Sequence, residues 1–495
     1  MSESKLSSLD SDRIPDGGAG KVVRSRWLVL GVFILLSMSN AFQWIEYSII
    51  ANIMVDFYGV PSIAIDWTSM IYMLAYIPLI FPAAWILDTY GLRLVGLLGA
   101  FGNCLGSWIK CASARPDRFG VTFLGQTIVG SSQIFILGLP PRLAAVWFGA
   151  SEVSTACAFG VFGNQLGIAA GFLVPPMMVR NSGDPNQIGS DLSHLFFLSA
   201  GINSIVFLLI FFFFKDAPPC PPSAAQQAAI AATMEKNFLN SLKQLLKNRN
   251  FLLLLVTYGL NVGAFYAVST LLNQMVLHYH PGEEVNVGRI GLLIVIAGML
   301  GSVLTGIWLD KTKTYKMTTL LVYLFSFVFM VVYAATLHLA HLWIVFVVAG
   351  LLGFFMTGYL PLGFELGAEL THPVSEGTTS GLLNASAQVF GVAETLGIGL
   401  MLQYTSIQAC NATLSAILLL GTILTGFIRS DLRRQAASNH SSTAILQNGN
   451  DAAIFNETTK MNESTSTTKM LADVNEMDED SEIMHPYSPR ISIIA

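Results

Sequence analysis

The sequence predicts an all-α membrane protein whose transmembrane helices number twelve and fall into two six-helix halves. Hydrophobic residues make up 53% of the 495 positions and charged residues only 12%, whereas a soluble protein carries roughly a quarter charged residues. Apolar runs of about 20 residues, the length that crosses a bilayer as a helix, recur between Trp27 and Ile428. Short motifs of the first half also recur in the second half at a nearly constant offset.

Each expected element follows from an apolar run and the charged or turn-forming residues that bound it. The twelve spans cover about 27–54, 64–88, 91–113, 118–140, 152–178, 193–215, 250–277, 286–309, 316–338, 341–364, 375–403 and 409–428. Residues 1–24 are polar and carry no cleavable signal pattern, so we expect a cytoplasmic tail there. We expect an amino-terminal half over 25–215, a cytoplasmic linker over 216–249 and a carboxy-terminal half over 250–430. Residues 431–495 are rich in Ser, Thr, Asn and acidic side chains, which predicts a disordered cytoplasmic tail.

The distribution of Lys and Arg predicts the orientation. With both termini in the cytoplasm, the inner segments hold eighteen Lys and Arg and the outer segments hold five, as the positive-inside rule requires. The outer five are Lys110, Arg115, Arg118, Arg180 and Arg289. The sequence therefore predicts that no cation lies in the membrane core. The plasma membrane is the expected location because no retention signal is recognisable, and an internal membrane is the alternative.

The two halves of the chain repeat one another. Three short matches align at nearly the same offset: Asp88 with Asp310 at 222 residues, Pro140 with Pro361 at 221, and Gln165 with Gln388 at 223. Two six-helix halves joined by a cytoplasmic linker are typical of the major facilitator fold. In that fold the halves are parallel repeats, and the binding site lies between them near the midplane.

The stretch DTYGLR over 88–93 has the D-x-x-G-x-R pattern of the loop between spans two and three in major facilitator transporters. Its glycine permits a tight turn. Asp88 and Arg93 are expected to make charge contacts that break when the two halves rock. Asp310, which several lysines follow, is the expected partner in the second half. Ordinary loop charges are the alternative interpretation of all three.

Span five contains glycines at intervals of four residues: Gly163, Gly167 and Gly171. This spacing puts them on one face of a helix, where a second helix can approach closely. We therefore expect tight helix packing at this face.

The stretch NAFQWIEYSII over 40–50 carries polar side chains inside the first span. The repeat offset of 222 residues relates Trp44 to Tyr266 in the first span of the second half. The first helices of the two halves line the central cavity in this fold, so we expect the two rings to face each other. Aromatic residues that face lipid are the alternative.

Two facing aromatic rings with no cation between them suit a positively charged guest. A ring face attracts a quaternary ammonium by up to about 2 kcal/mol or more once water is excluded. Polar side chains in central spans are candidates for binding a hydroxyl group or orienting the guest: Gln133, Gln165, Gln388, Tyr72 and Asn384. Structural amides that bridge helices are the alternative for each.

Glu46 and Glu394 are the only carboxylates that look embedded in the membrane. An intramembrane carboxylate indicates a counter-charge or a proton relay. Glu46, however, lies two residues from Trp44 and so on nearly the opposite side of the helix. If Trp44 faces the cavity, Glu46 faces a neighbouring helix.

Several function classes are disfavoured. All eight histidines fall in loops, at span ends or in the tail, and the five cysteines are scattered as small packing residues. A haem would find neither an imidazole ligand nor a cation for its propionates in the core. No phosphate-binding loop, hydrolytic constellation or metal-spaced cluster is present, so we expect no enzyme, no cofactor and no nucleic-acid partner. Transport is then driven by gradients, and the membrane potential supplies about 2.3 kcal/mol per charge per 100 mV.

Five stretches carry a resemblance to a known family. FQWIEYSIIANI, AIDWTSMIYMLAYIPL, VWFGASEVSTACAFGVFGNQLG, YHPGEEVNVGRIGL and SEGTTSGLLNASAQVFG resemble the feline leukaemia virus subgroup C receptor family of major facilitator transporters. The resemblance covers about 25–430. Members of that family are described as choline and ethanolamine transporters, and haem is also proposed for some.

The resemblance implies roles for individual residues. Trp44 and Tyr266 match the pair that holds the trimethylammonium group of choline in the family. Gln133 and Gln388 match cavity glutamines, and Tyr72 matches a further cavity position. Glu46 occupies a position where relatives carry Gln, which leaves open a shifted substrate preference or a coupled proton.

Three hypotheses follow. The first is a facilitative transporter of choline or ethanolamine that works by alternating access in the lipid bilayer. The second is a haem exporter, which would have to use the loop residues His278 and His280. The third is a membrane receptor or sensor that does not transport and recruits partners through its tail.

Overall fold

The computed structural model describes residues 25–149, 152–218, 238–339, 341–374, 376–429, 431 and 433. The expected amino-terminal tail, residues 219–237 of the expected linker and nearly all of the expected carboxy-terminal tail lie outside this part. The helices belong to one compact unit that ends at Asp431.

The first part of the chain forms helices up to Phe213. They are α1 (Ser25–Ile45), the 3₁₀ turn η2 (Ser48–Ile50), α2 (Ala51–Tyr58), α3 (Ser62–Cys111), α4 (Phe119–Leu137), α5 (Leu139–Trp147), α6 (Val153–Met178) and α7 (Pro185–Phe213). The second part contains α9 (Phe238–Lys247), α10 (Arg249–Tyr279), α11 (Glu284–Thr312), α12 (Tyr315–Thr336), α13 (Leu342–Thr371), α14 (Glu376–Tyr404) and α15 (Ile407–Phe427).

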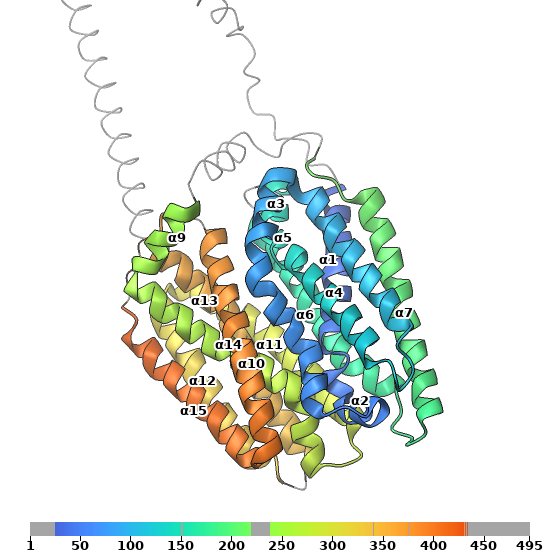
Figure 1. Cartoon of the computed structure of the whole chain (residues 1–495). Helices are drawn as coiled ribbons and strands as arrows, with labels where there is room; N and C mark the ends of the chain where they lie inside the picture. Colours follow the sequence, from blue (N-terminus) through green and yellow to red (C-terminus); the bar gives the residue numbers. More distant parts are fainter. Residues whose placement is uncertain are drawn as a thin grey trace, which may run out of the picture. The chain divides into compact units, whose positions relative to one another are not determined.

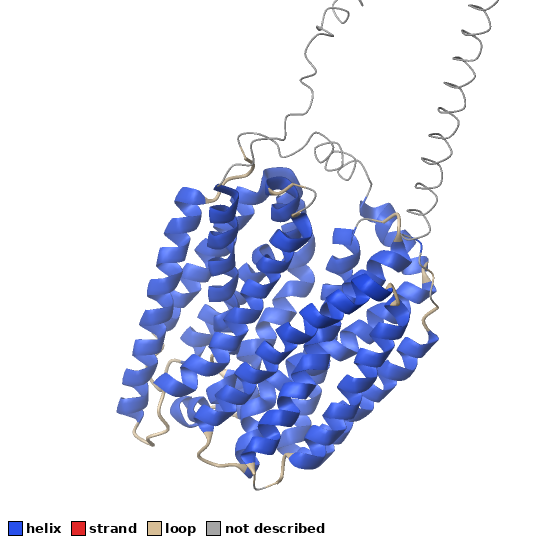
Figure 2. Cartoon of the chain, turned by 180° about the vertical axis from the view of Figure 1, so that it is seen from behind, coloured by secondary structure: helices blue, strands red, loops and turns tan. Residues whose placement is uncertain are grey.

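Twelve of the helical segments in the described residues are long and apolar enough to cross a membrane. This number confirms the sequence prediction, and helix pairs such as α4 with α5 form a single span. Figure 1 shows α1, α4 and α7 in one group and α12, α13 and α15 in another. The helix α9 lies at one end of the bundle and α2 at the other, and these are called the α9 end and the α2 end below (Figure 1). Figure 2 shows the described residues as helices joined by loops.

The two passes of α3 meet at Gly91. This glycine has φ +83°, in the left-handed region where a side chain is strained, and so it makes the tight turn predicted for DTYGLR. A Cβ at this position would lie 2.7 Å from Oδ1 of Asp216. That oxygen accepts a hydrogen bond of 2.7 Å from the backbone N–H of Arg93. The glycine therefore lets the chain reverse direction and brings the start of the linker against the turn.

The first span is broken, although the sequence predicts one helix over 27–54. The structure ends α1 at Ile45, inserts η2 and resumes with α2. A break at membrane depth is tolerated only where the freed carbonyl groups find partners inside the protein. The break follows Trp44 directly, which places it beside the expected site.

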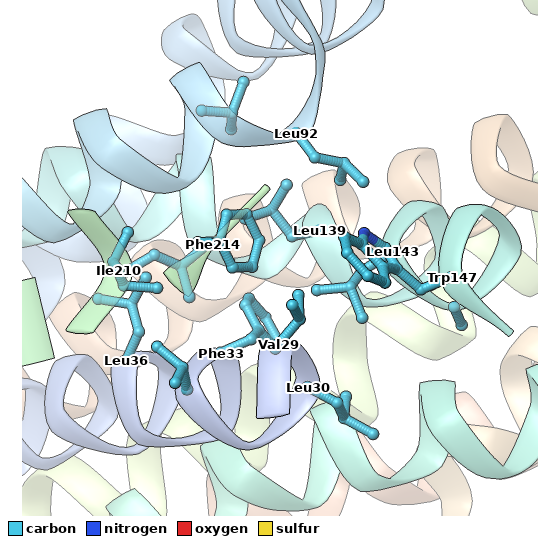
Figure 3. Packing of buried hydrophobic residues seen from close by; sticks show 14 of the residues in the cluster. Val29, Leu30, Phe33, Leu36, Leu92, Leu139, Leu143, Trp147, Ile210 and Phe214 are labelled. Carbon is cyan, nitrogen blue, oxygen red and sulfur yellow. The ribbon is translucent and has the colours of Figure 1, made fainter. Parts of the chain in front are cut away.

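Small residues fix the position of α1 against its neighbours. A Cβ on Gly167 of α6 would lie 2.8 Å from Cα of Met38, and one on Gly171 would lie 2.8 Å from the carbonyl oxygen of Phe42. These contacts confirm the predicted close packing at the glycine face of span five. At the beginning of α1, Phe33 packs into an apolar cluster with Leu143 of α5 (Figure 3). These contacts pack α1 against α5 and α6.

Candidate functional site

Trp44 and Tyr266 form an edge-to-face pair between the two halves. Their ring centroids lie 5.5 Å apart and the planes meet at 70°, a favoured geometry for aromatic pairs. Trp44 projects from the last turn of α1 and Tyr266 from the middle of α10. The structure thus brings together the two rings that the repeat relates. Their role in holding a guest stays a prediction.

The surroundings of Tyr266 come from three helices. Gln388 of α14 is buried, and its Nε2 donates to the Tyr266 hydroxyl at 3.4 Å. A Cβ on Gly391 would meet the Tyr266 ring at 2.7 Å and Sδ of Met73 at 2.9 Å. Met73 of α3 was not among the predicted residues, because one methionine in an apolar run carries no distinguishing signal.

The other predicted residues are Tyr72, Gln133 and Asn384, and their part in binding stays a prediction. The Tyr72 hydroxyl donates to Oε1 of Gln126 at 3.4 Å, and its ring lies against Gly130 of α4. These two contacts lie within the half that contains Tyr72. Gln133 and Asn384 are half-buried, and Asn384 precedes Gln388 by one turn on α14.

Side chains from other helices satisfy the carbonyl groups around the break in the first span. Nε2 of Gln126 donates to the carbonyl of residue 43 at 2.9 Å. The Ser69 hydroxyl donates to the carbonyl of Trp44 at 3.0 Å. Nδ2 of Asn273, which belongs to the other half, donates to the carbonyl of Ile49 at 2.7 Å. The break next to Trp44 is therefore held from both halves.

Lys110 and Glu46 form a buried ion pair inside the amino-terminal half. Both side chains are only 1% exposed. Nζ of Lys110 also donates to Oε1 of Gln126 at 3.0 Å. The expectation that no cation lies in the membrane core is wrong for Lys110, because this lysine turns inward to a carboxylate 64 positions away in the sequence. The expectation that Glu46 faces a neighbouring helix is confirmed.

The remaining polar residues of the first span enter a network of amides. Nδ2 of Asn40 donates to Oδ1 of Asn103 at 3.1 Å, and Nε2 of Gln43 donates to the same oxygen at 2.9 Å. Nδ2 of Asn103 in turn donates to Oδ1 of Asn203 at 2.6 Å. These bonds join α1, α3 and α7 inside one half. Asn40 and Gln43 therefore bridge helices inside this half.

Hydrogen bonds join the two halves at the α2 end. Asn52 exchanges two bonds with Asn273, of 3.3 and 3.1 Å. Oε1 of Glu284 accepts from Asn52 at 3.2 Å and from Asn181 at 2.9 Å. Nearby, Nε2 of Gln274 donates to Oδ1 of Asp66 at 2.7 Å. The halves are therefore fastened together at this end.

Of the three predicted gating residues, the structure describes the side chain of Arg93 alone. The Arg93 guanidinium donates to the carbonyl of Phe211 at 3.4 Å, a bond within its own half. The side chains of Asp88 and Asp310 lie outside the part that the structure describes. The gating role of all three stays a prediction.

Buried carboxylates are more numerous than the sequence predicts. Asp66, Asp191 and Glu369 are buried in addition to Glu46 and Glu394, so the expectation of only two embedded carboxylates is wrong. The three additional carboxylates lie near span ends, where sequence alone does not separate buried from exposed positions. Within the described ranges, no three His, Cys, Asp or Glu side chains form a group that could hold a metal ion.

Comparisons with known proteins agree with this arrangement. The family model described as Major Facilitator Superfamily matches residues 29–393. The choline/ethanolamine transporter flvcr2b of Danio rerio is 56% identical over 425 residues, which are 86% of this chain and 88% of that protein. The choline/ethanolamine transporter FLVCR2 of Homo sapiens is 53% identical over 428 residues, 86% of this chain and 81% of that protein. Among solved structures, a D-xylose-proton symporter has a TM-score of 0.59 at 11% identity and covers 82% of this chain and 98% of its own, which shows a shared fold.

Proposed function

Because the chain belongs to the Major Facilitator Superfamily and, within it, to the feline leukaemia virus subgroup C receptor family, we propose that it carries choline, with ethanolamine as a second substrate. The carrier works by facilitative alternating access. The observation that carries this proposal is the edge-to-face pair of Trp44 and Tyr266, with one ring from the first helix of each half. The names of the relatives support the choice of substrate.

The chemistry of the pair suits an organic cation. A trimethylammonium group needs no hydrogen-bond acceptor, and ring faces attract it by up to about 2 kcal/mol or more in a dry site. The amides of Gln388 and Gln133 would bind the hydroxyl group that choline and ethanolamine share. Lys110 alone would repel a cation. Its charge is neutralised by Glu46, with which it forms a buried ion pair inside the amino-terminal half.

The same ion pair disfavours anionic cargo. Lys110 is engaged by Glu46 and Gln126, so it is not available to a carboxylate such as a haem propionate. The haem hypothesis would then depend on His278 and His280. His278 lies in the last turn of α10 and His280 directly follows the helix, away from the aromatic pair.

The distribution of Lys and Arg supports an orientation with the α9 end in the cytoplasm and the α2 end outside, in the plasma membrane. In that orientation the bonds of Asn52, Asn273 and Glu284 close the outer side. We therefore assign the structure to a state closed toward the outside. Transport requires that these bonds break in the opposite state.

Uptake of radiolabelled choline into proteoliposomes tests the proposal. We expect Trp44→Ala and Tyr266→Ala each to weaken choline binding about 30-fold, the equivalent of about 2 kcal/mol. Trp85→Ala is the matched control, because Trp85 is 60% exposed on the outer surface of the bundle. Size-exclusion profiles establish that each variant is folded. Normal uptake by both site variants would reject the aromatic pair as the binding site, and no uptake by the wild type would reject choline.

A further inference from the structure

Gln126 of α4 is a fully buried amide whose hydrogen-bonding positions are all in use. Its Nε2 donates to the carbonyl of residue 43 at 2.9 Å and to the carbonyl of Thr68 at 3.2 Å. Its Oε1 accepts from Nζ of Lys110 at 3.0 Å and from the Tyr72 hydroxyl at 3.4 Å. A glutamine side chain has two N–H donors and two acceptor positions. Gln126 therefore connects α1, α3 and α4 with no bonding capacity left over.

The two donors of Gln126 hold the broken end of the first helix. α1 ends one residue beyond Trp44, and the last carbonyl groups of a helix have no partner within it. At membrane depth such a carbonyl needs a donor from elsewhere in the protein. Gln126 supplies that donor for residue 43, and Ser69 supplies it for Trp44. Because the same Nε2 also binds the carbonyl of Thr68, the end of α1 is tied to α3.

Lys110 determines which way the Gln126 amide points. An ammonium group can only donate hydrogen bonds, so the amide atom that faces it has to be the oxygen. The Nε2 atom then points to the two carbonyl groups. The ion pair with Glu46 keeps the ammonium group in place. A Cβ on Gly125 would lie 2.6 Å from Cγ of Lys110, so the missing side chain lets the lysine pass across α4.

The position of the Trp44 ring depends on the backbone that carries it. This ring meets Tyr266 of the other half with centroids 5.5 Å apart. The attraction between a ring face and a cation requires that the cation lies close to the ring. A binding group has to be held to within about 0.5 Å by the residues behind it. The bonds from Gln126 to the end of α1 meet this requirement for Trp44.

We propose that Gln126 is a positioning residue for the substrate cation. It fixes the end of α1 and thereby the ring of Trp44, and the pair of Lys110 and Glu46 orients its amide. The inference rests on the proposed function, because the ring that Gln126 positions is the ring assigned to the cation. Gln126 and Trp44 belong to the same half, so the support acts in every state of a facilitative carrier.

Gln126→Met tests the inference, because methionine has nearly the same length and forms none of these hydrogen bonds. Binding of radiolabelled choline to the purified full-length protein measures the affinity, which we expect to fall about fivefold. Asn248→Ala is the matched control at the α9 end. The Asn248 side chain also bonds backbone groups: the carbonyl of Leu370 and the N–H groups of Asn250 and Phe251. Its loss should lower the unfolding temperature and leave the affinity unchanged.

A double-mutant cycle separates positioning from a general loss of stability. Because Gln126 acts through Trp44, Gln126→Met should change the affinity less than about twofold in the Trp44→Ala background. The exchange variant, Glu46→Gln with Gln126→Glu, keeps one carboxylate and one amide beside Lys110. Residue 126 then accepts from the lysine but donates to neither carbonyl. This variant should fold and still bind choline about fivefold more weakly.

Hydrogen–deuterium exchange of residues 45–51 gives a readout that needs no choline. We expect Gln126→Met to accelerate exchange in this segment about fivefold, and Asn248→Ala to leave it unchanged. Unchanged exchange in Gln126→Met, unchanged affinity, or an equal loss of affinity with and without Trp44 each overturns the inference. Absence of choline binding by the wild type rejects the proposed function instead, and the exchange rates then still decide whether Gln126 holds the break.

Discussion

Lys110 and Glu46 form an ion pair in which both side chains are 1% exposed, and Gln126 is the third member of the group. The pair joins the end of α3 to the break in the first span. A buried pair of this kind adds little net stability over apolar residues, but the loss of one partner leaves the other charge uncompensated. Its two members therefore depend on each other.

Lys110→Met should destabilise the protein strongly. It leaves the Glu46 carboxylate without its cation, at a cost of about 3–5 kcal/mol. Thermal unfolding in detergent micelles measures the loss. The double variant Lys110→Met with Glu46→Gln removes both charges and should recover most of the stability. A double variant no more stable than the single one would show that the lysine acts through its packing.

Tyr266→Phe separates the ring from its hydroxyl group. This variant keeps the ring that faces Trp44 and loses only the acceptor for Gln388. One neutral hydrogen bond contributes about 1 kcal/mol, so we expect choline affinity to fall about fivefold. Tyr266→Ala should weaken binding several times more. Tyr404→Ala is the control, because Tyr404 is 83% exposed. Equal losses for Phe and Ala would assign the role to the hydroxyl group.

Asn273→Ala should loosen the α2 end. It removes both bonds to Asn52 and the bond to the carbonyl of Ile49. At about 1 kcal/mol per hydrogen bond, the population open at this end should rise at least fivefold. A cysteine in place of Ser269, which is buried one turn beyond Tyr266, should then react faster with a membrane-impermeant thiol reagent.

The control for this measurement is Gln403→Ala. Gln403 makes one exposed bond of 3.4 Å to Ser62, so its removal should leave the reaction rate nearly unchanged. The protein without the introduced cysteine gives the background from native thiols. Similar rates in Asn273→Ala and in the parent would mean that other contacts keep the α2 end closed.

Gly167→Ala should destabilise the contact between α6 and α1. Its methyl group would lie 2.8 Å from Cα of Met38 and 2.9 Å from Cβ of Ala41, so the helices would have to separate, at about 1–3 kcal/mol. Gly201→Ala is the matched control, because a Cβ there meets nothing within 4 Å. In a helix interior that change should stabilise the protein by up to about 1 kcal/mol. Thermal unfolding of the two variants under the same conditions compares their stabilities with that of the wild type.

The fold was predictable because it depends on local patterns. Apolar runs predict the spans, and the constant offset between motifs pairs Trp44 with Tyr266 without any knowledge of their contacts. The features that the sequence does not predict depend on distant partners. The sequence places Lys110 in an outer segment, because no local pattern joins it to Glu46, which lies 64 positions away. The sequence also predicts an unbroken first span, because the donor to the Ile49 carbonyl, Asn273, lies 224 positions away.

The break after Trp44 links the binding ring to the position of the other half. Gln126 and Ser69 hold it from within the amino-terminal half, and these bonds can persist in any state of the carrier. Asn273 belongs to the other half, so its bond to the Ile49 carbonyl lasts only while the α2 end is closed. When that end opens, the segment beyond Trp44 loses the hydrogen bond from Asn273. The same ring would then hold its guest with different affinity in the two states, so the concentration that half-saturates the carrier would differ between the two sides of the membrane, while the direction of net transport would still follow the gradient.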